Sequence, residues 1–323
     1  MKILLSIITV VFIFSGCSTK QYFEPEDTSN NNLSSKQMSE EIISLNSDGA
    51  ILENFRVINK DGLTNYFLLE GYTFLNKSGN QILSADKFGN IMIDKKIINL
   101  KENIVAASIK KDLLALVFAN NTIALYNLTD NKYTFKEKLK VSIINDVRIA
   151  NPIFLKSTVI FPTLNGRVIF TSLNTSEILR NINLDPTDKV NNIIFLKTIG
   201  ETLIASTSNK ILSIFDGNFN IKEHRVKDII TNSNNIFIAT LNGTIIKFDF
   251  SLNQKAIKKF KFANIFALGY GTSLYALESQ DYLIKINDAF TKTTVYDFSF
   301  DESSKTIVID NTLYFDDEYV KLP

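Results

Sequence analysis

Few residues of this chain are of a type that catalysis or metal binding requires. His224 is its only histidine and Cys17 its only cysteine. A lone histidine cannot form a multi-histidine metal site, and a Ser-His-Asp triad would depend on it alone. Its neighbours, Lys-Glu before it and Arg after it, predict a packed or solvated position on a surface strand. We therefore expect no catalytic residue, no resident metal and no cofactor.

Acidic stretches near the C-terminus are the remaining candidates for metal binding. Asp297, Asp301 and Glu302 are close in the sequence, and Asp316 is followed by Asp317. Calcium prefers oxygen ligands, but calcium loops place Asp, Asn and Gly densely over about 12 positions. These stretches lack that spacing, so the pattern favours turns and solvated faces.

Cys17 offers a different chemistry, which depends on the residues before it. Lys2 precedes an apolar run from Ile3 to Phe14, and Gly16 stands directly before the cysteine. A positive start, a short apolar stretch and small residues after it are the layout of a secretory signal. The stretch is shorter than the about 20 apolar residues that span a bilayer. The Gly-Cys pair resembles the lipobox of bacterial lipoproteins; the alternative is a plain secretory signal with an incidental cysteine.

The lipobox resemblance implies a lipid-anchored protein. Residues 1–16 would be the signal peptide, and Cys17 would become the acylated N-terminus. One acyl chain binds a membrane only marginally, and the three chains of such lipoproteins, palmitate among them, imply a stable anchor. Ser18, in place of Asp, resembles a sorting signal for the outer membrane. The expected location is therefore the periplasmic face of the outer membrane.

Composition excludes some classes of partner. Without Lys2 the mature chain carries equal numbers of basic and acidic residues and no long basic run. Nucleic-acid binding, which requires a basic surplus to neutralise phosphates, is disfavoured. The lone cysteine excludes an intramolecular disulfide. The domain must therefore be held together by its core, for which 45% hydrophobic residues suffice.

The chain divides into a leader, a tether and one β domain. Residues 17–46 are expected to be the lipidated cysteine and a flexible tether, polar and turn-rich from Glu24 to Asn32. A short helix is expected over Ser34 to Leu45. Residues 47–323 consist of short runs rich in Val, Ile, Phe, Tyr and Thr, which favour strands.

An internal repeat runs through this β domain. Seven units each contain an apolar run, a tight polar turn and a second β run. Their turn residues are 31 to 45 positions apart, about 38 on average, and a period near 40 is typical of β-propellers. Asn-Gly, present in two of the turns, suits hairpins because both central residues need positive φ. The turn residues are Asn90, Asn121, Gly166, Asn209, Gly243, Asp281 and Asp317.

The predicted fold is an all-β propeller of seven blades, each of four antiparallel strands. Inner strands such as Leu113 to Ala119 and Ile236 to Ala239 are almost wholly apolar, as expected where blades cover both faces. The last unit lacks an outer strand, and we expect Ala50 to Ile58 to complete it. Eight blades is the alternative, if Leu63 to Phe74 builds a separate blade.

Two units carry a family likeness. Asn151 to Leu179, with Pro, an apolar strand, Thr-Leu-Asn-Gly and a second apolar strand, resembles the PQQ-type propeller repeat, and Ile238 to Asp249 is similar. Such repeats usually end in a Trp that packs on the next blade. This chain has no Trp. The residues expected to replace it are Phe260, Phe262, Phe298 and Phe300.

A lipoprotein built of such repeats resembles the BamB family, which belongs to the outer-membrane β-barrel assembly complex. This resemblance implies a non-catalytic, monomeric propeller that acts within a hetero-complex, assisting barrel assembly through protein contacts. A small-ligand binding protein or enzyme that uses the central channel is one alternative. A surface-exposed adhesive lipoprotein is another. The fold alone does not decide among them, because propellers host many functions.

Overall fold

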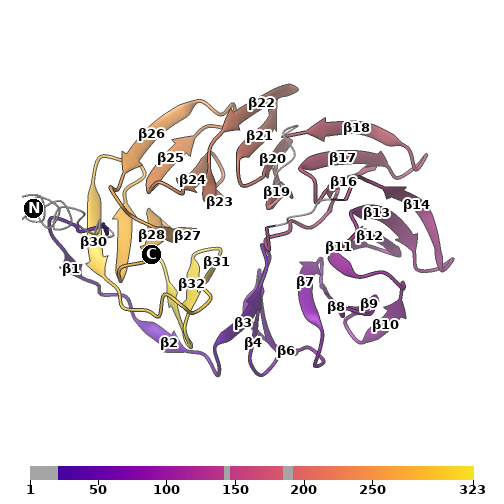
Figure 1. Ribbon diagram of the computed structural model, residues 1–323, viewed down its shortest axis with the longest axis horizontal. Helices are drawn as coiled ribbons and strands as arrows, with labels where there is room; N and C mark the ends of the chain where they lie inside the picture. Colours follow the sequence, from indigo (N-terminus) through magenta and orange to yellow (C-terminus); the bar gives the residue numbers. More distant parts are fainter. Residues whose placement is uncertain (1–20, 142–145, 185–191) are drawn as a thin grey trace, which may run out of the picture.

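The computed structural model describes residues 21–141, 146–184 and 192–323. These residues form strands and turns, with eight sheets arranged as the blades of a closed ring (Figure 1). The all-β propeller is therefore confirmed. The blade number is eight, the alternative, and the expectation of seven was wrong.

Blades 1 to 4 follow one another along the chain, and each runs from an inner strand to an outer edge. Blade 1 contains β3 (Ile42–Leu45), β4 (Ala50–Leu52), β5 (Arg56–Asn59) and β6 (Gly62–Phe67); blade 2 contains β7 (Thr73–Ser78), β8 (Gln81–Ala85), β9 (Asn90–Ile93) and β10 (Lys96–Asn99). Blade 3 contains β11 (Ile104–Lys110), β12 (Leu113–Phe118), β13 (Thr122–Asn127) and β14 (Lys132–Lys138); blade 4 contains β15 (Ile153–Phe154), β16 (Thr158–Pro162), β17 (Arg167–Ser172) and β18 (Ile178–Asn183).

Blades 5 to 8 continue the ring and include two strands from the start of the chain. Blade 5 contains β19 (Phe195–Ile199), β20 (Thr202–Ser206), β21 (Lys210–Phe215) and β22 (Asn218–Glu223); blade 6 contains β23 (Val226–Thr231), β24 (Ile236–Thr240), β25 (Thr244–Phe248) and β26 (Gln254–Lys259). Blade 7 contains β27 (Ile265–Tyr270), β28 (Leu274–Glu278), β29 (Tyr282–Ile286), β30 (Thr293–Asp297) and β1 (Ser29–Asn30); blade 8 contains β31 (Ile307–Ile309), β32 (Thr312–Phe315), β33 (Glu318–Lys321) and β2 (Ser35–Gln37).

The additional blade is blade 1, and it lies where a closing strand was expected. The segment from Ala50 to Ile58 forms β4 and β5, which pair with each other rather than with the last blade. Its turn places Phe55 at φ 66°, a conformation that Asn or Gly usually supplies. That turn carries no hairpin dipeptide, which explains why the repeat pattern did not reveal the unit.

The ring is closed by β2 instead. It pairs antiparallel with β33, Ser35 opposite Val320, and supplies the fourth strand of blade 8. The helix expected over Ser34 to Leu45 was therefore wrong, because these residues form β2 and β3. Pairing with an open sheet edge satisfies the backbone groups of a polar segment that has little apolar surface of its own.

The core lies between the blades. The buried apolar side chains of the described residues form eight clusters, and each cluster joins two neighbouring blades. Leu114 to Phe118 and Ile236 to Ala239 are fully buried, which confirms that the middle strands lose water on both faces. Phe260, Phe298 and Phe300 are buried as expected, whereas Phe262 is 43% exposed and does not replace a docking Trp.

The expected turn chemistry is present in most units. At Gly243 an added Cβ would lie 2.4 Å from the Phe260 carbonyl oxygen, so only glycine fits there. In the first unit the left-handed residue is Gly89, one position before the expected Asn90. Four expected turn residues have positive φ, namely Asn121, Gly166, Gly243 and Asp281.

Strand alternation gives the ring two distinct faces. Turns between first and second strands, and between third and fourth strands, lie on one face, which we call the mouth face. Turns between second and third strands lie on the opposite face, which we call the strap face, and the connections from each fourth strand to the next blade begin there. This follows because successive antiparallel strands reverse direction.

The segment before β2 lies on the propeller and not away from it. Phe23 is buried against the rings of Phe260 and Tyr282, at centroid distances of 5.8 and 5.7 Å. Further on, β1 pairs parallel with β30, and the Thr28 hydroxyl donates to Asp297. We call residues 23–33 the strap. The flexible tether expected over residues 17–46 is thus a bound segment from Phe23 onward, while residues 1–16 and Cys17 lie outside the described residues.

Candidate functional site

A segment between blades 3 and 4 enters the middle of the ring. Residues 146–152, which we call the crossing segment, precede the short inner strand β15 and run toward β3 (Figure 1). The Ser108 hydroxyl of blade 3 donates to the Pro152 carbonyl at 2.6 Å, and the Ser47 hydroxyl of blade 1 donates to the Ile149 carbonyl at 3.2 Å. The segment therefore links blade 3, which precedes it in the chain, to blade 1, which is distant in the chain.

Asn151 is the centre of these contacts. Its side-chain oxygen accepts the Ala107 N–H of blade 3 at 2.9 Å. Its side-chain nitrogen donates to the Leu75 carbonyl of blade 2 at 2.8 Å and to the Asp48 carboxylate of blade 1 at 2.7 Å. One buried amide thus connects three inner edges and closes the channel on that side.

Arg148 holds the other end of the crossing segment. Its guanidinium donates to both carboxylate oxygens of Asp146, at 2.9 and 2.5 Å, and to the Lys227 carbonyl of blade 6. Asn192 receives the Asp146 N–H and donates to the Arg148 carbonyl, each at 2.6 Å. Burial alone would raise the pKa of Asp146, but the bonded guanidinium holds that pKa below its ordinary value. This bidentate geometry fixes the segment firmly.

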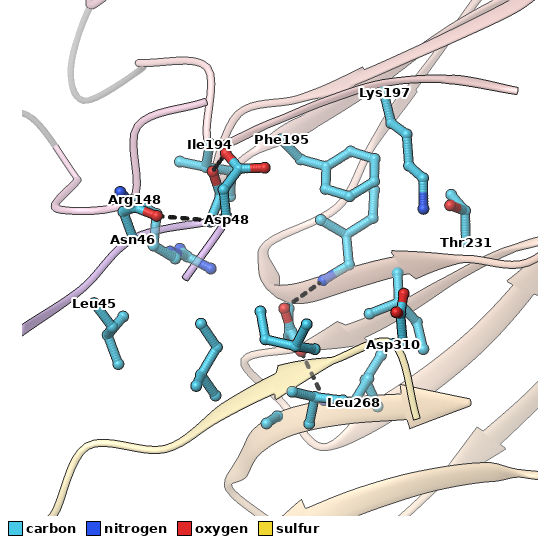
Figure 2. Close-up of a pocket in the computed structure, with 18 of the residues that line it drawn as sticks. Leu45, Asn46, Asp48, Arg148, Ile194, Phe195, Lys197, Thr231, Leu268 and Asp310 are labelled. Carbon is cyan, nitrogen blue, oxygen red and sulfur yellow. Dashed lines mark hydrogen bonds between the residues drawn. The ribbon is translucent and has the colours of Figure 1, made fainter. Parts of the chain in front are cut away.

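The rest of the channel is an open cavity of about 1030 Å³ (Figure 2). Its wall combines the crossing segment with the inner strands of blades 1, 5, 6, 7 and 8. It reaches the mouth face, where turn residues of several blades line it: Asp48, Asn232, Gly271, Asp310 and Asn311. This volume is at the upper end of small-molecule pockets, about 300–1,000 Å³.

Charges of both signs lie in this cavity. Lys60 and Lys197 are exposed lysines on blades 1 and 5. Figure 2 shows the Lys197 side chain extending toward Thr231, and its ammonium has no hydrogen-bond or ion-pair partner within the described residues. Asp310, in the turn between β31 and β32 of blade 8, also lines the cavity, and Phe195 of blade 5 is one of the apolar side chains there. The lining is mixed and can pair with polar, charged and apolar groups at once.

Asp228 is a second deeply set carboxylate of the cavity wall, beside Asp146. It accepts the Leu268 N–H at 2.7 Å and the Ile229 N–H at 2.8 Å. Desolvation raises its pKa above the ordinary aspartate value, although these bonds and the nearby Arg148 act in the opposite direction. Because both oxygens already bind backbone groups, Asp228 orders blades 6 and 7 rather than facing a ligand.

The residues that sequence analysis singled out do not gather at this cavity. His224 packs on the Phe248 ring at 5.5 Å, and burial with the neighbouring Lys222 lowers its pKa, so its expected packing role is confirmed. Asp301 lies in the connection from β30 to β31, and its N–H donates at 3.1 Å to the carboxylate of Asp316 in the turn between β32 and β33. Asp297 binds the strap.

Sequence reasoning missed the crossing segment and the cavity lysines. One signal was available, because the turn residues Asn121 and Gly166 are 45 positions apart, the longest spacing of the repeat. Those surplus residues supply the crossing segment. Lys60 and Lys197 carried no such signal, since inward and outward lysines look alike in a sequence.

Other charged groups in the core have structural partners. Lys247 donates to the Asp288 carboxylate at 2.8 Å and joins blades 6 and 7. Glu278 is fully buried and accepts the N–H groups of Asn264 and Gln280. Within the described ranges, no three His, Cys, Asp or Glu residues are grouped so that they could hold a metal ion. The same part of the chain contains no helix long and apolar enough to cross a membrane.

Similarity to named sequences covers nearly the whole chain. The chain is 28% identical to the plasminogen-binding protein PgbB of Helicobacter pylori strain J99, over 99% of this chain and 71% of that protein. The PgbB of strain 26695 matches at the same identity, over 99% of this chain and 70% of that protein. No protein-family model matches the chain.

Similarity to solved structures shows the fold. BamB from Moraxella catarrhalis superposes with a TM-score of 0.65 at 15% identity, covering 90% of this chain and 98% of that one. The C-terminal WD40 domain of Sif2 reaches 0.61 at 13% identity, covering 90% and 98%. The computationally designed Ika8 protein reaches 0.60 at 13% identity, covering 92% and 98%. Such different proteins share the propeller, so these likenesses establish architecture and not function.

Proposed function

We propose that this protein is a non-catalytic, protein-binding propeller of the bacterial envelope, anchored through Cys17 and binding its partner at the open cavity. The observation that carries the proposal is the similarity over 99% of the chain to PgbB, a protein named for binding plasminogen. Plasminogen is therefore the first partner to test. This corresponds to the adhesive alternative of the sequence analysis.

The cavity supports a protein partner rather than a small molecule. A small ligand is usually held in a pocket that covers most of its surface. Here Val147, at the crossing segment, is 82% exposed, and the lining lysines reach solvent. Side chains of a protein segment can enter such a cavity while the rest of the partner covers the mouth face. Mixed charges then select the partner by electrostatic complementarity.

The test is a binding titration with the soluble chain from residue 18 onward. We expect saturable binding to immobilised plasminogen, and at least a tenfold weaker affinity for the variant Lys60→Glu/Lys197→Glu. The matched control Lys96→Glu/Lys292→Glu makes the same charge change on exposed lysines outside the cavity. Equal loss in both variants would contradict the cavity as the site, and absence of binding in the unmodified chain would contradict plasminogen as the partner.

A second candidate partner is the outer-membrane β-barrel assembly complex. The BamB likeness, which covers 98% of that structure, supports it at the level of fold. The lipidated protein would be isolated from membranes in mild detergent and its co-purifying proteins identified by mass spectrometry. Stoichiometric recovery of the barrel-forming assembly subunit would support this function, and recovery of the protein alone would contradict it.

A further inference from the structure

The strap face carries a set of exposed apolar side chains on its turns. Phe88 and Leu241 lie in turns between second and third strands, and Leu69, Val141 and Phe262 lie in connections between blades. Each is exposed, Phe88 by 69%. Among the described residues, the mouth-face turns carry one comparably exposed large apolar side chain, Leu155, and Val147 of the crossing segment is exposed at the cavity. Projecting apolar residues are therefore concentrated on one face.

Lysines accompany these side chains. The Lys87 ammonium lies 5.1 Å from the centre of the Phe88 ring, and that of Lys261 lies 4.8 Å from the Phe262 ring. Aromatic and aliphatic residues beside basic ones are typical of surfaces that lie in a lipid headgroup region. Acidic residues share this face at blades 2, 7 and 8, where Asp86, Asp301 and Asp316 lie in turns and connections. Attraction to anionic lipid is therefore confined to blades 3 and 6, whose strap-face ends carry Lys138 and Lys261.

The strap places the proposed anchor on this same face. Phe23 packs on Phe260, in the connection from blade 6 to blade 7, and on Tyr282 at the start of β29. Six residue steps separate Phe23 from Cys17. Even a fully extended chain of that length spans only about 20 Å. A lipid on Cys17 would therefore keep the rim of blades 6 and 7 close to the membrane, with the strap face nearest.

We propose that the strap face is a membrane-docking surface, which lies on a bilayer containing anionic lipid and directs the mouth face away from it. The inference rests on the proposed anchoring at Cys17, because the anchor supplies most of the binding. The apolar turns and lysines supply the orientation. A partner would then approach the cavity from the side opposite the membrane without displacing lipid.

The absence of Trp from the chain permits a direct test. Single reporters would be introduced as Phe262→Trp and Leu241→Trp on the strap face, with Leu155→Trp on the mouth face as matched control. The sole cysteine would be coupled to a maleimide lipid in vesicles of phosphatidylethanolamine and phosphatidylglycerol, so that anchoring does not depend on natural lipidation. Quenching of Trp fluorescence by brominated lipid would be measured for each variant.

We expect brominated lipid to quench the two strap-face reporters at least twofold more strongly than the Leu155→Trp reporter. The difference should decrease when phosphatidylcholine replaces phosphatidylglycerol or when salt is raised, because charge attraction is screened. Equal quenching at all three positions, or no quenching at any, would overturn the proposal. Plasminogen binding is measured without vesicles, so failure of that function would be distinguishable from failure of this orientation.

Discussion

The two sides of the central channel use their polar residues in opposite ways. On the side of blades 1 to 3, the side-chain amide of Asn151 in the crossing segment forms hydrogen bonds with Ala107, Leu75 and Asp48. On the other side, which blades 5 to 8 border together with Lys60 of blade 1, Lys197 extends into the cavity without a partner among the described residues. Polar groups whose hydrogen bonds are all formed within the protein stabilise the fold. Polar groups left unpaired at a surface are available to bind a partner protein.

The comparison also separates stability from function. Removing one member of a buried, fully hydrogen-bonded network lowers the free energy of unfolding most, because the remaining groups stay buried and unpaired. Substituting an exposed charge changes the free energy of unfolding little, because water solvates the groups around it. We call the side held by the crossing segment the sealed side and the side of the cavity the open side. Substitutions on the sealed side should therefore change the free energy of unfolding, and substitutions on the open side should change the affinity for a partner.

The largest expected effect is on the sealed side. Asn151→Ala should lower the free energy of unfolding by about 2–4 kcal/mol, because it leaves buried groups of three blades without partners. Chemical denaturation followed by circular dichroism measures this. The exposed Asn181→Ala on β18 is the control and should change stability by less than about 0.5 kcal/mol. Equal stability of the two variants would show that the crossing segment does not hold the ring.

A smaller, pH-dependent effect is expected at Asp146. Asp146→Asn removes the charge that pairs with Arg148 and should cost about 2 kcal/mol at neutral pH. The folded-state pKa of Asp146 is lowered, so its contribution is complete above the unfolded pKa of about 4 and is lost as pH falls through the folded value. Denaturation of both proteins from pH 7 to pH 2.5 should therefore show curves that converge at acid pH. A difference that stays constant with pH would contradict the ion pair as its cause.

The smallest effect on stability is expected on the open side. Lys60→Glu/Lys197→Glu should shift the unfolding free energy by less than about 0.5 kcal/mol, because both side chains are exposed. The same variant should lose binding, as argued above. Thermal unfolding of the variant beside the unmodified chain checks the first part. A large destabilisation would show that these lysines belong to the structure of the channel and would remove the contrast between the two sides.

The sequence reveals the propeller wherever turn chemistry is explicit. Asn-Gly at Gly166 and Gly243 marks hairpins because the backbone there must adopt positive φ. The repeat pattern did not reveal blade 1, because Phe55 adopts the positive-φ conformation in its turn, and tertiary packing rather than local preference holds it there. The closing strand β2 could not be predicted, because Ser-Lys-Gln has no β propensity. It forms a strand because β33 offers an open edge with which to pair.

Most of the candidate site could not be predicted from the sequence, for a physical reason. Asn151 and Pro152 open the repeat that resembled PQQ-type units, so they stood in a recognised motif. Their function in the ring, however, depends on contacts with Asp48 and Leu75, which are distant in the chain. Such contacts follow from closure of the ring, and no local pattern encodes them.

The most direct test of a protein-binding open side is to place a reporter there. In a chain with Cys17→Ser, an environment-sensitive dye would be attached through Lys197→Cys in the cavity, and in a second chain through Lys96→Cys on the outer strand β10. Titration with plasminogen should shift the emission of the cavity dye with a saturable dependence and leave the outer dye unchanged. A response of the outer dye alone, or no response at either position, would contradict the claim that the open side of the channel is where this propeller binds protein.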